Sequence, residues 1–138
     1  MTTHSRAILL VEDNEDDEKL TLMAFEKNGI ANKVVVVRDG EEALEYLFGT
    51  EDKPQVIMMD LKLPKIGGLE VLKKIRENEK TKFLPVVVLT SSKEEQDIIQ
   101  AYNLGTNAYV RKPVDFVHFI EAIKQLGLFW LILNEYPR

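Results

Sequence analysis

The sequence has 138 residues, a formal net charge of −5 and no cysteine. Its length is that of one domain, so we expect a single domain over residues 1–138 without an output domain. The lack of cysteine excludes disulfides, thiolate zinc sites and a cysteine nucleophile, and the negative charge argues against generic nucleic-acid binding. The longest apolar run, Leu128–Leu133, is too short for a membrane span. Because no signal-peptide pattern is present, the sequence predicts a cytoplasmic protein without membrane contact.

Short apolar runs alternate with longer amphipathic stretches along the whole chain. In chain order, the sequence predicts a strand over Ala7–Val11, a helix over Glu15–Asn28, a strand over Val34–Val37, a helix over Glu41–Phe48, a strand over Val56–Asp60, a helix over Leu69–Asn78, a strand over Val86–Thr90, a helix over Lys93–Leu104, a strand over Ala108–Val110 and a helix over Asp115–Leu126. Such alternation predicts an α/β fold in which right-handed crossovers build a parallel sheet with helices on both faces.

Local residue choices support these elements. The runs AILLV, VIMM and VVVLT are apolar on both alternating faces, as is typical of strands that are buried on both faces of a parallel sheet. Gly29 and Gly105 follow the first and fourth predicted helices, where glycine commonly ends a helix.

Polar residues follow the predicted strands at the edge where an open parallel sheet binds its ligands. Glu12 and Asp13 follow the first strand, Asp60 ends the third, Thr90 ends the fourth and Lys112 follows the fifth. Carboxylates gathered at one edge repel one another, and a hard cation such as Mg²⁺ would balance them. A carboxylate can also act as a nucleophile toward phosphorus, while a lysine and a hydroxyl stabilise the transferred group.

Each of these residues alone also has an ordinary structural interpretation. The acidic run Glu12–Glu18 is typical of a solvated loop and a helix start, where acids are favoured electrostatically. Asp60 could cap a helix, Thr90 could be an ordinary strand residue, and Lys112 could be a surface lysine. The helix-start interpretation accounts for Glu15–Glu18 but does not explain why Glu12 and Asp13 directly follow a buried strand.

The segments ILLVEDNEDD, VRDGEEALEYL, VIMMDLKLPKIGGLEVLKKIR, PVVVLTSS and AYVRKPVD resemble response-regulator receiver domains of two-component signalling. This resemblance implies one receiver domain with a flavodoxin-like, doubly wound sheet of order 2-1-3-4-5. It implies a phosphorylation-controlled switch that accepts a phosphoryl group from a sensor histidine kinase. The switch would signal through protein contacts and would lack conventional enzymatic turnover.

The resemblance also assigns roles in the acidic part of the site. Asp60 matches the phosphoacceptor, and Asp13 matches the main acidic Mg²⁺ ligand. Glu12 matches its acidic neighbour, which acts through water, and the backbone carbonyl of Lys62 matches a further metal ligand.

Three further positions match family residues that respond to the phosphoryl group. Thr90 matches the switch hydroxyl, Tyr109 the switch aromatic and Lys112 the lysine that pairs with the phosphoryl group. The resemblance further implies a cis peptide bond between Lys112 and Pro113.

Three other functions fit the sequence less well than the switch. A phosphatase-like enzyme with Asp60 as nucleophile generally has a second aspartate two residues later, where this sequence has Lys62. A flavin or nucleotide carrier on the same fold would bind phosphate in a glycine-rich or hydroxyl-rich loop, whereas the loop here is acidic. A phosphorylation-independent interaction module normally lacks the equivalent of Asp60 or Lys112.

A narrower resemblance concerns the segments Gly49–Pro54, LPVVVLTSS and GLFWLILNEYP. They are similar to stand-alone regulators that partner phytochrome-type histidine kinases.

The apolar run Leu128–Leu133 predicts an exposed patch near the face of the fourth helix, fifth strand and fifth helix. We therefore expect a two-fold homodimer through this C-terminal face.

Overall fold

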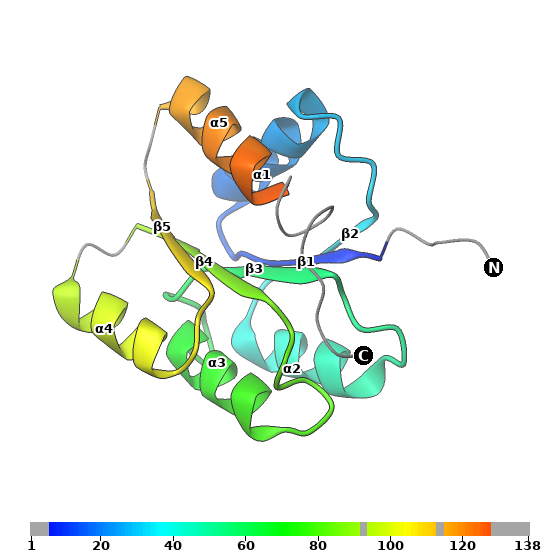
Figure 1. Ribbon diagram of the computed structural model, residues 1–138, viewed down its shortest axis with the longest axis vertical. Coiled ribbons are helices and arrows are strands. Elements are labelled where there is room, and N and C mark those ends of the chain that lie inside the picture. Colours follow the sequence, from blue (N-terminus) through cyan, green and yellow to red (C-terminus); the bar gives the residue numbers. More distant parts are fainter. Residues whose placement is uncertain (1–5, 92–93, 113–114, 128–138) are drawn as a thin grey trace.

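The structure is a computed structural model that describes residues 6–91, 94–112 and 115–127, and it contains every predicted element (Figure 1). The helix and strand ends differ from the predicted ends by at most two residues. In chain order, the elements are β1 (Ile8–Val11), α1 (Glu15–Lys27), β2 (Val34–Val37), α2 (Gly40–Gly49), β3 (Val56–Met59), α3 (Gly68–Glu77), β4 (Val86–Thr90), α4 (Glu95–Asn103), β5 (Ala108–Arg111) and α5 (Phe116–Gly127).

The strands form one parallel sheet in the order β2-β1-β3-β4-β5. This order confirms the predicted flavodoxin-like, doubly wound architecture. Helices α1 and α5 cover one face of the sheet, and α2, α3 and α4 cover the other (Figure 1). Because the strands are parallel, their carboxyl ends all meet at one edge of the molecule.

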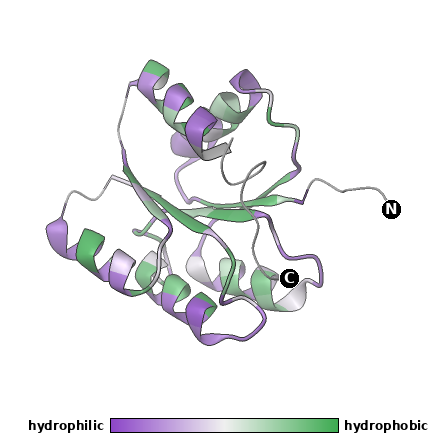
Figure 2. Cartoon of the chain, in the orientation of Figure 1, coloured by the Kyte–Doolittle hydropathy of each residue, from purple (hydrophilic) through white to green (hydrophobic). Residues whose placement is uncertain are grey.

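The core is divided by the sheet into two apolar layers. Ile8 and Leu10 of β1 pack with α1 and α5, whereas Leu9 and Val11 pack with α2 and α3. The same alternation in β3 and β4 explains why these strands are apolar at nearly every position. Figure 2 shows the apolar strands between helices whose outward faces are more hydrophilic.

Two helix starts are capped at the same edge as the strands' carboxyl ends. The side chain of Asn14 caps α1 by accepting a hydrogen bond from the Asp17 backbone N–H at 2.9 Å. The side chain of Asp39 caps α2 by accepting one from the Glu42 backbone N–H at 2.8 Å. Both caps satisfy backbone donors that helix geometry leaves unpaired, and so they fix where each helix begins.

Two glycines allow the loop between β3 and α3 to lie close to its neighbours. A Cβ atom on Gly68 would lie 2.5 Å from the Asp60 carbonyl oxygen, and one on Gly40 would lie 1.9 Å from the Ile66 carbonyl oxygen. Any larger residue would therefore displace the backbone that carries Asp60. Gly68 and Gly40 are thus required by close approach of the chain next to the sheet edge.

Helices α1 and α5 are joined by a side-chain bridge at the end of α1. Asn28, the C-cap of α1, donates hydrogen bonds through Nδ2 to the carbonyl oxygen of Ala24 at 2.9 Å and to that of Ile120 at 3.0 Å. The first bond terminates α1, and the second attaches this end of α1 to α5.

Within the described ranges, no helix has the length and hydrophobicity needed to cross a membrane. Two sequence predictions lie outside the described residues. One is the cis peptide bond between Lys112 and Pro113, and the other is the C-terminal run Leu128–Leu133 with its dimer contact.

Candidate functional site

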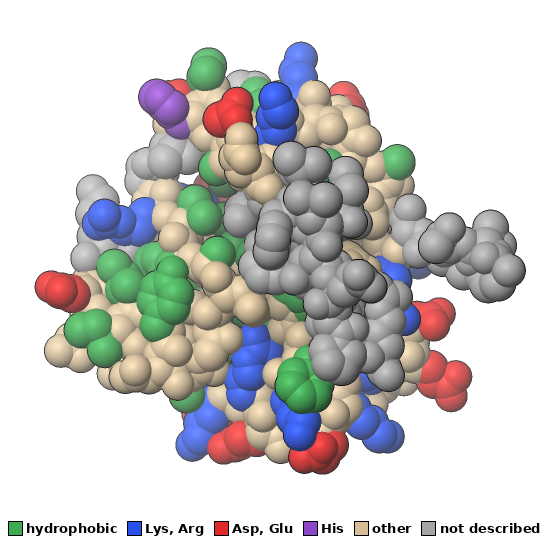
Figure 3. Space-filling view, in the orientation of Figure 1, with side chains coloured by type: hydrophobic (Ala, Val, Ile, Leu, Met, Phe, Trp, Pro, Cys, Tyr) green, Lys and Arg blue, Asp and Glu red, His purple; other side chains and the backbone are tan. Residues whose placement is uncertain are grey.

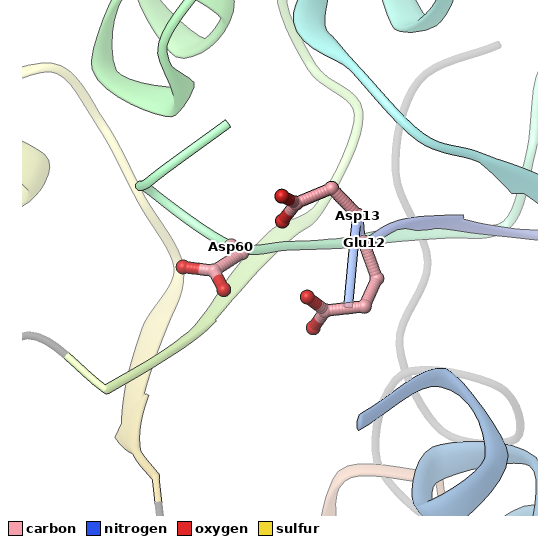
Figure 4. A group of neighbouring side chains, drawn as sticks. All are labelled: Glu12, Asp13 and Asp60. Atoms are coloured by element: carbon pink, nitrogen blue, oxygen red, sulfur yellow. The ribbon is translucent and has the colours of Figure 1, made fainter. Parts of the chain in front are cut away.

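Three carboxylates meet at the carboxyl edge of the sheet. Glu12 follows β1, and its backbone N–H donates to the Val37 carbonyl at 3.0 Å; Asp60 follows β3, and its N–H donates to the Val11 carbonyl at 3.1 Å. One carboxylate oxygen from each of Glu12, Asp13 and Asp60 lies within 4.8 Å of the others (Figure 4). Glu12 and Asp60 are buried and Asp13 is exposed, so the cluster opens to solvent on the Asp13 side.

The donor set of this cluster fits a small divalent cation. Oxygens bound about 2.1 Å from one Mg²⁺ lie roughly 3 to 4.2 Å apart, so the side chains would need to shift by about an ångström or less. All three groups are carboxylates, which hard cations prefer over nitrogen or sulfur. The side chains therefore agree with the predicted metal site.

Lys112 places its ammonium group among the acids of this edge. Its Nζ atom lies 2.7 Å from Glu12 Oε1, 2.9 Å from Asp17 Oδ2 and 3.5 Å from Asp60 Oδ2. The lysine is only 5% exposed, so water does not replace these contacts. The sequence prediction that Lys112 lies beside Asp60 agrees with this geometry.

Burial and the partner's charge shift the pKa of each member of the buried pair Lys112–Glu12 in opposite directions. Burial alone would lower the pKa of Lys112, but hydrogen bonds to Glu12 and Asp17 and the charge of Asp60 raise that pKa above its ordinary value. Burial raises the pKa of Glu12 above its ordinary value, because the hydrogen bond from Lys112 restores only part of the lost hydration. Lys112 therefore carries its charge, in contact with three acids at once.

The two oxygens of Asp60 have different environments. Oδ1 accepts a hydrogen bond from Thr90 Oγ1 at 2.7 Å and another from the backbone N–H of Lys62 at 3.1 Å. Oδ2 has the longer contact of 3.5 Å with Lys112 Nζ. The hydrogen bonds orient the carboxylate and leave Oδ2 as its more weakly bonded oxygen.

Tyr109 and the Lys62 side chain lie farther from this centre. Tyr109 pairs with Val88 in the sheet while Thr90 pairs with Arg111, so Tyr109 and Thr90 share a sheet face on adjacent strands, two register positions apart. The Lys62 ammonium lies 3.6 Å from Asp97 of α4. The structure thus places the backbone of Lys62 at Asp60 and its side chain toward α4.

Asp17 is a site residue that the sequence interpretation missed. That interpretation explained Glu15–Glu18 as acids at a helix start, whereas Asp17 contacts Lys112 at 2.9 Å. A signal was present, since Asp17 stands one helical turn after Asp13 and three residues after the cap Asn14.

Comparisons with known proteins give the same family by sequence and by structure. The sequence matches the family described as response regulator receiver domain over residues 8–124. The phosphorylated cyanobacterial phytochrome response regulator RcpA is 36% identical, with a TM-score of 0.89 over 98% of this chain and 100% of that chain. The bacteriophytochrome response regulator AtBRR is 52% identical, with a TM-score of 0.76 over 96% of this chain and 100% of that chain.

A third relative was solved with a metal ion. Response regulator Rcp1 of Synechocystis sp. strain PCC 6803 is 35% identical over 131 residues, which cover 91% of this chain and 89% of Rcp1. The structure of its Mn²⁺-bound form has a TM-score of 0.86 over 96% of this chain and 99% of that chain. Sequence, fold and the acidic cluster agree, and the chain therefore belongs to the response regulator receiver family: it is a receiver domain of two-component signalling, a module with a histidine kinase as partner rather than a conventional enzyme.

Proposed function

We propose that Asp60 is the residue that accepts the phosphoryl group and that Oδ2 is its attacking oxygen. The observation that carries this proposal is the unequal bonding of the carboxylate. Oδ1 is held by Thr90 and Lys62, whereas Oδ2 has only the long contact with Lys112. An oxygen with fewer hydrogen-bond donors is the better nucleophile, and the Lys112 ammonium, 3.5 Å from Oδ2, supplies positive charge to the incoming group when it moves closer.

The transfer reaction is a displacement at phosphorus. A lone pair of Asp60 Oδ2 forms the new P–O bond while the P–N bond to the donor histidine breaks, and the imidazole nitrogen keeps that electron pair. Hydrolysis later restores the carboxylate when water attacks phosphorus and the bond to Asp60 breaks. Lys112 stabilises the transferred oxygens in both steps, and the Thr90 hydroxyl keeps the carboxylate in line.

The metal of this site is proposed to be Mg²⁺. Glu12, Asp13 and Asp60 would hold it, together with the backbone carbonyl of Lys62. When bound, it supplies positive charge that offsets the repulsion between the carboxylates and an anionic donor. The Mn²⁺-bound form of Rcp1 supports a divalent cation at this site.

Thr90 and Tyr109 are proposed to carry the change away from Asp60. A phosphoryl group adds about −1.5 to −2 charges and new acceptor oxygens, which would draw the Thr90 hydroxyl from its bond to Asp60. Tyr109 shares the sheet face of Thr90 on the next strand, which supports the proposal that it fills the space that Thr90 leaves. The phosphoryl group would thereby shift an existing balance between two conformations.

The output surface is proposed to include α4 and β5. Ile99 and Tyr102 of α4 are 45% and 52% exposed. Figure 3 shows hydrophobic side chains gathered over this part of the molecule. Exposed apolar patches on small domains commonly mark protein contacts.

We also propose a two-fold homodimer in which the apolar run Leu128–Leu133 makes the contact. Light scattering of the full chain and of a chain ending at Gly127 tests it, since a dimer is expected from the full chain alone.

The proposed kinase partner is of the phytochrome type. RcpA and AtBRR, which are named as phytochrome and bacteriophytochrome response regulators, support this assignment. Incubation with phosphorylated histidine kinases tests it. We expect transfer from a phytochrome-type kinase to be at least about tenfold faster than transfer from a kinase with a different sensor. Equal rates would contradict the assignment.

Labelling with acetyl phosphate and Mg²⁺ tests Asp60 directly. We expect the wild-type chain to gain one phosphoryl group, which intact mass measures. The variant Asp60→Asn is expected to gain none, because the amide is not a comparable nucleophile. Asp52→Asn, which removes an exposed acid from a loop, serves as the matched control and is expected to label normally. Full labelling of Asp60→Asn would overturn the proposal.

A further inference from the structure

Asp17 binds the site lysine from outside the group of carboxylates that can hold a metal. Its Oδ2 atom lies 2.9 Å from Lys112 Nζ, whereas its carboxylate is not part of the cluster formed by Glu12, Asp13 and Asp60. The Asp17 side chain is 37% exposed, compared with 3% for Glu12. Asp17 is therefore the more weakly enclosed of the two short partners of Lys112.

The backbone of α1 holds Asp17 in this position. The Asp17 N–H donates to Asn14 Oδ1 at 2.9 Å, and the Asp17 carbonyl accepts a hydrogen bond from Thr21 Oγ1 at 2.8 Å. These bonds fix the first turn of the helix, which directs the carboxylate to Lys112. The contact is thus oriented by the helix start and does not depend on a flexible loop.

The Lys112 ammonium has three hydrogens to share among its partners. Glu12 and Asp17 accept at 2.7 and 2.9 Å, and Asp60 Oδ2 is left with the contact of 3.5 Å. An incoming phosphoryl group beside Oδ2 needs this ammonium closer to Asp60. Because Glu12 is buried next to Asp60, the bond to Asp17 is the one that must lengthen when Lys112 moves.

We propose that Asp17 is a positioning residue that holds Lys112 back from Asp60 and so slows phosphorylation. This inference rests on the proposed function of Asp60 as phosphoacceptor. The carboxylate of Asp17 acts in two ways, and both slow phosphorylation. It competes with the phosphoryl oxygens for the ammonium, and it reduces the positive charge that the donor meets.

The test compares Asp17→Asn with Asp16→Asn. Both variants remove one acid from the first turn of α1, and Asp16 is exposed on the same turn. The measured quantity is the second-order rate constant for labelling by acetyl phosphate with Mg²⁺. For a partly exposed, charge-assisted contact, we expect Asp17→Asn to raise it roughly 3- to 10-fold and Asp16→Asn to change it less than about twofold.

Two further measurements separate positioning from a structural role of Asp17. Asp17→Glu keeps an acceptor for Lys112 and is expected to return the rate to within about twofold of wild type. The NMR signal of the Lys112 ammonium is expected to remain in Asp16→Asn and Asp17→Glu, and to weaken through faster hydrogen exchange in Asp17→Asn. A rate for Asp17→Asn equal to that of Asp16→Asn, or an unchanged ammonium signal, would overturn the inference.

The outcomes also distinguish this inference from the proposed function. If the wild-type chain gains no phosphoryl group, the proposed role of Asp60 fails. If the wild-type chain is labelled at Asp60 and Asp17→Asn is not faster, only the role of Asp17 fails.

Discussion

Lys112 and Arg76 are both cations drawn into the protein, at opposite edges of the same sheet. Lys112 lies at the carboxyl edge among carboxylates, which raise its pKa. Arg76 lies at the other edge, where it donates to the carbonyl oxygens of Leu84 at 2.8 Å and Gly105 at 2.8 Å, and burial lowers its pKa. The partners of Lys112 are charged carboxylates of the acidic site, whereas those of Arg76 are neutral groups, mostly backbone carbonyls.

This difference indicates that Lys112 has a role in the site, whereas Arg76 stabilises the fold. Arg76 also donates to the Lys82 carbonyl at 3.1 Å and to Asn107 Oδ1 at 3.0 Å, so it joins the loops before β4 and β5. The proposed phosphoryl transfer does not involve the acceptors of Arg76. Each contact of Lys112, in contrast, can be replaced when the charge at Asp60 changes. The comparison predicts that substitutions at the carboxyl edge, around Lys112, alter phosphoryl transfer. Substitutions at the opposite edge, around Arg76, are predicted to alter stability.

Removal of divalent cations is expected to have the largest effect on the carboxyl edge. In excess chelator, labelling of Asp60 by acetyl phosphate is expected to fall to background, because the acids outnumber Lys112 and repel the donor. Loss of one ligand in Asp13→Ala is expected to weaken Mg²⁺ binding roughly 10-fold or more, as measured by calorimetry. Arg76→Ala is the control from the other edge and is expected to keep its Mg²⁺ affinity. Unchanged labelling in excess chelator would contradict the metal assignment.

Lys112→Ala is expected to slow labelling by about 100-fold or more, because it removes a cation aimed at the developing charge of the transferred group. The rate of phosphoryl gain measures this effect, and circular dichroism checks that the chain is folded. The matched control Lys73→Ala removes an exposed lysine from α3 and is expected to label normally. If Lys112→Ala labelled at the wild-type rate, the lysine would have no part in the transfer.

Arg76→Ala is expected to lower the free energy of unfolding by about 2 to 4 kcal/mol, since several carbonyl groups lose a charged donor. Urea unfolding measures this change. Lys74→Ala, on the same helix but exposed in an ion pair with Glu70, is expected to change it by less than about 1 kcal/mol. Labelling of Arg76→Ala well below its unfolding midpoint is expected to match wild type. A large loss of labelling there would remove the distinction between the two edges.

Thr90→Ala is expected to have the smallest effect on the transfer itself. Lys62 still donates to Asp60 Oδ1 in this variant, so we expect labelling at a rate within about tenfold of wild type. The conformational response is expected to be lost, and NMR shifts around Tyr109 measure it. A full phosphorylation-induced shift at Tyr109 in this variant would show that the signal does not pass through Thr90.

Much of the fold and part of the site could be predicted because their causes are local in the sequence. Strands that are apolar on both faces identify a parallel sheet, and a charged residue directly after such a strand stands out. Glu12, Asp60 and Lys112 were predicted in this way, and the structure brings them together. Their roles rest on a family resemblance and remain proposals that the labelling experiments test.

Asp17 and Arg76 could not be predicted in the same way, for two physical reasons. An acid in the first turn of a helix is favoured by the helix itself, which conceals a second role such as the contact of Asp17 with Lys112. Arg76 binds backbone carbonyls, which every residue carries, so no side-chain pattern marks its partners. Tyr109 is an intermediate case. Its strand could be predicted from the sequence, but its position on the same sheet face as Thr90 follows only from the register of β4 and β5.

The bridge from Asn28 to Ile120 determines how α1 and α5 can move relative to each other. At the end of α1 the two helices are joined by a neutral hydrogen bond of 3.0 Å. At the other end, Asp17 of α1 is joined to Lys112, just before α5, by an ion pair that can lengthen. α1 is therefore fixed to α5 at its last residues, while its first turn is held through a contact that can change. We therefore expect phosphorylation to change the angle between α1 and α5 without sliding one helix along the other.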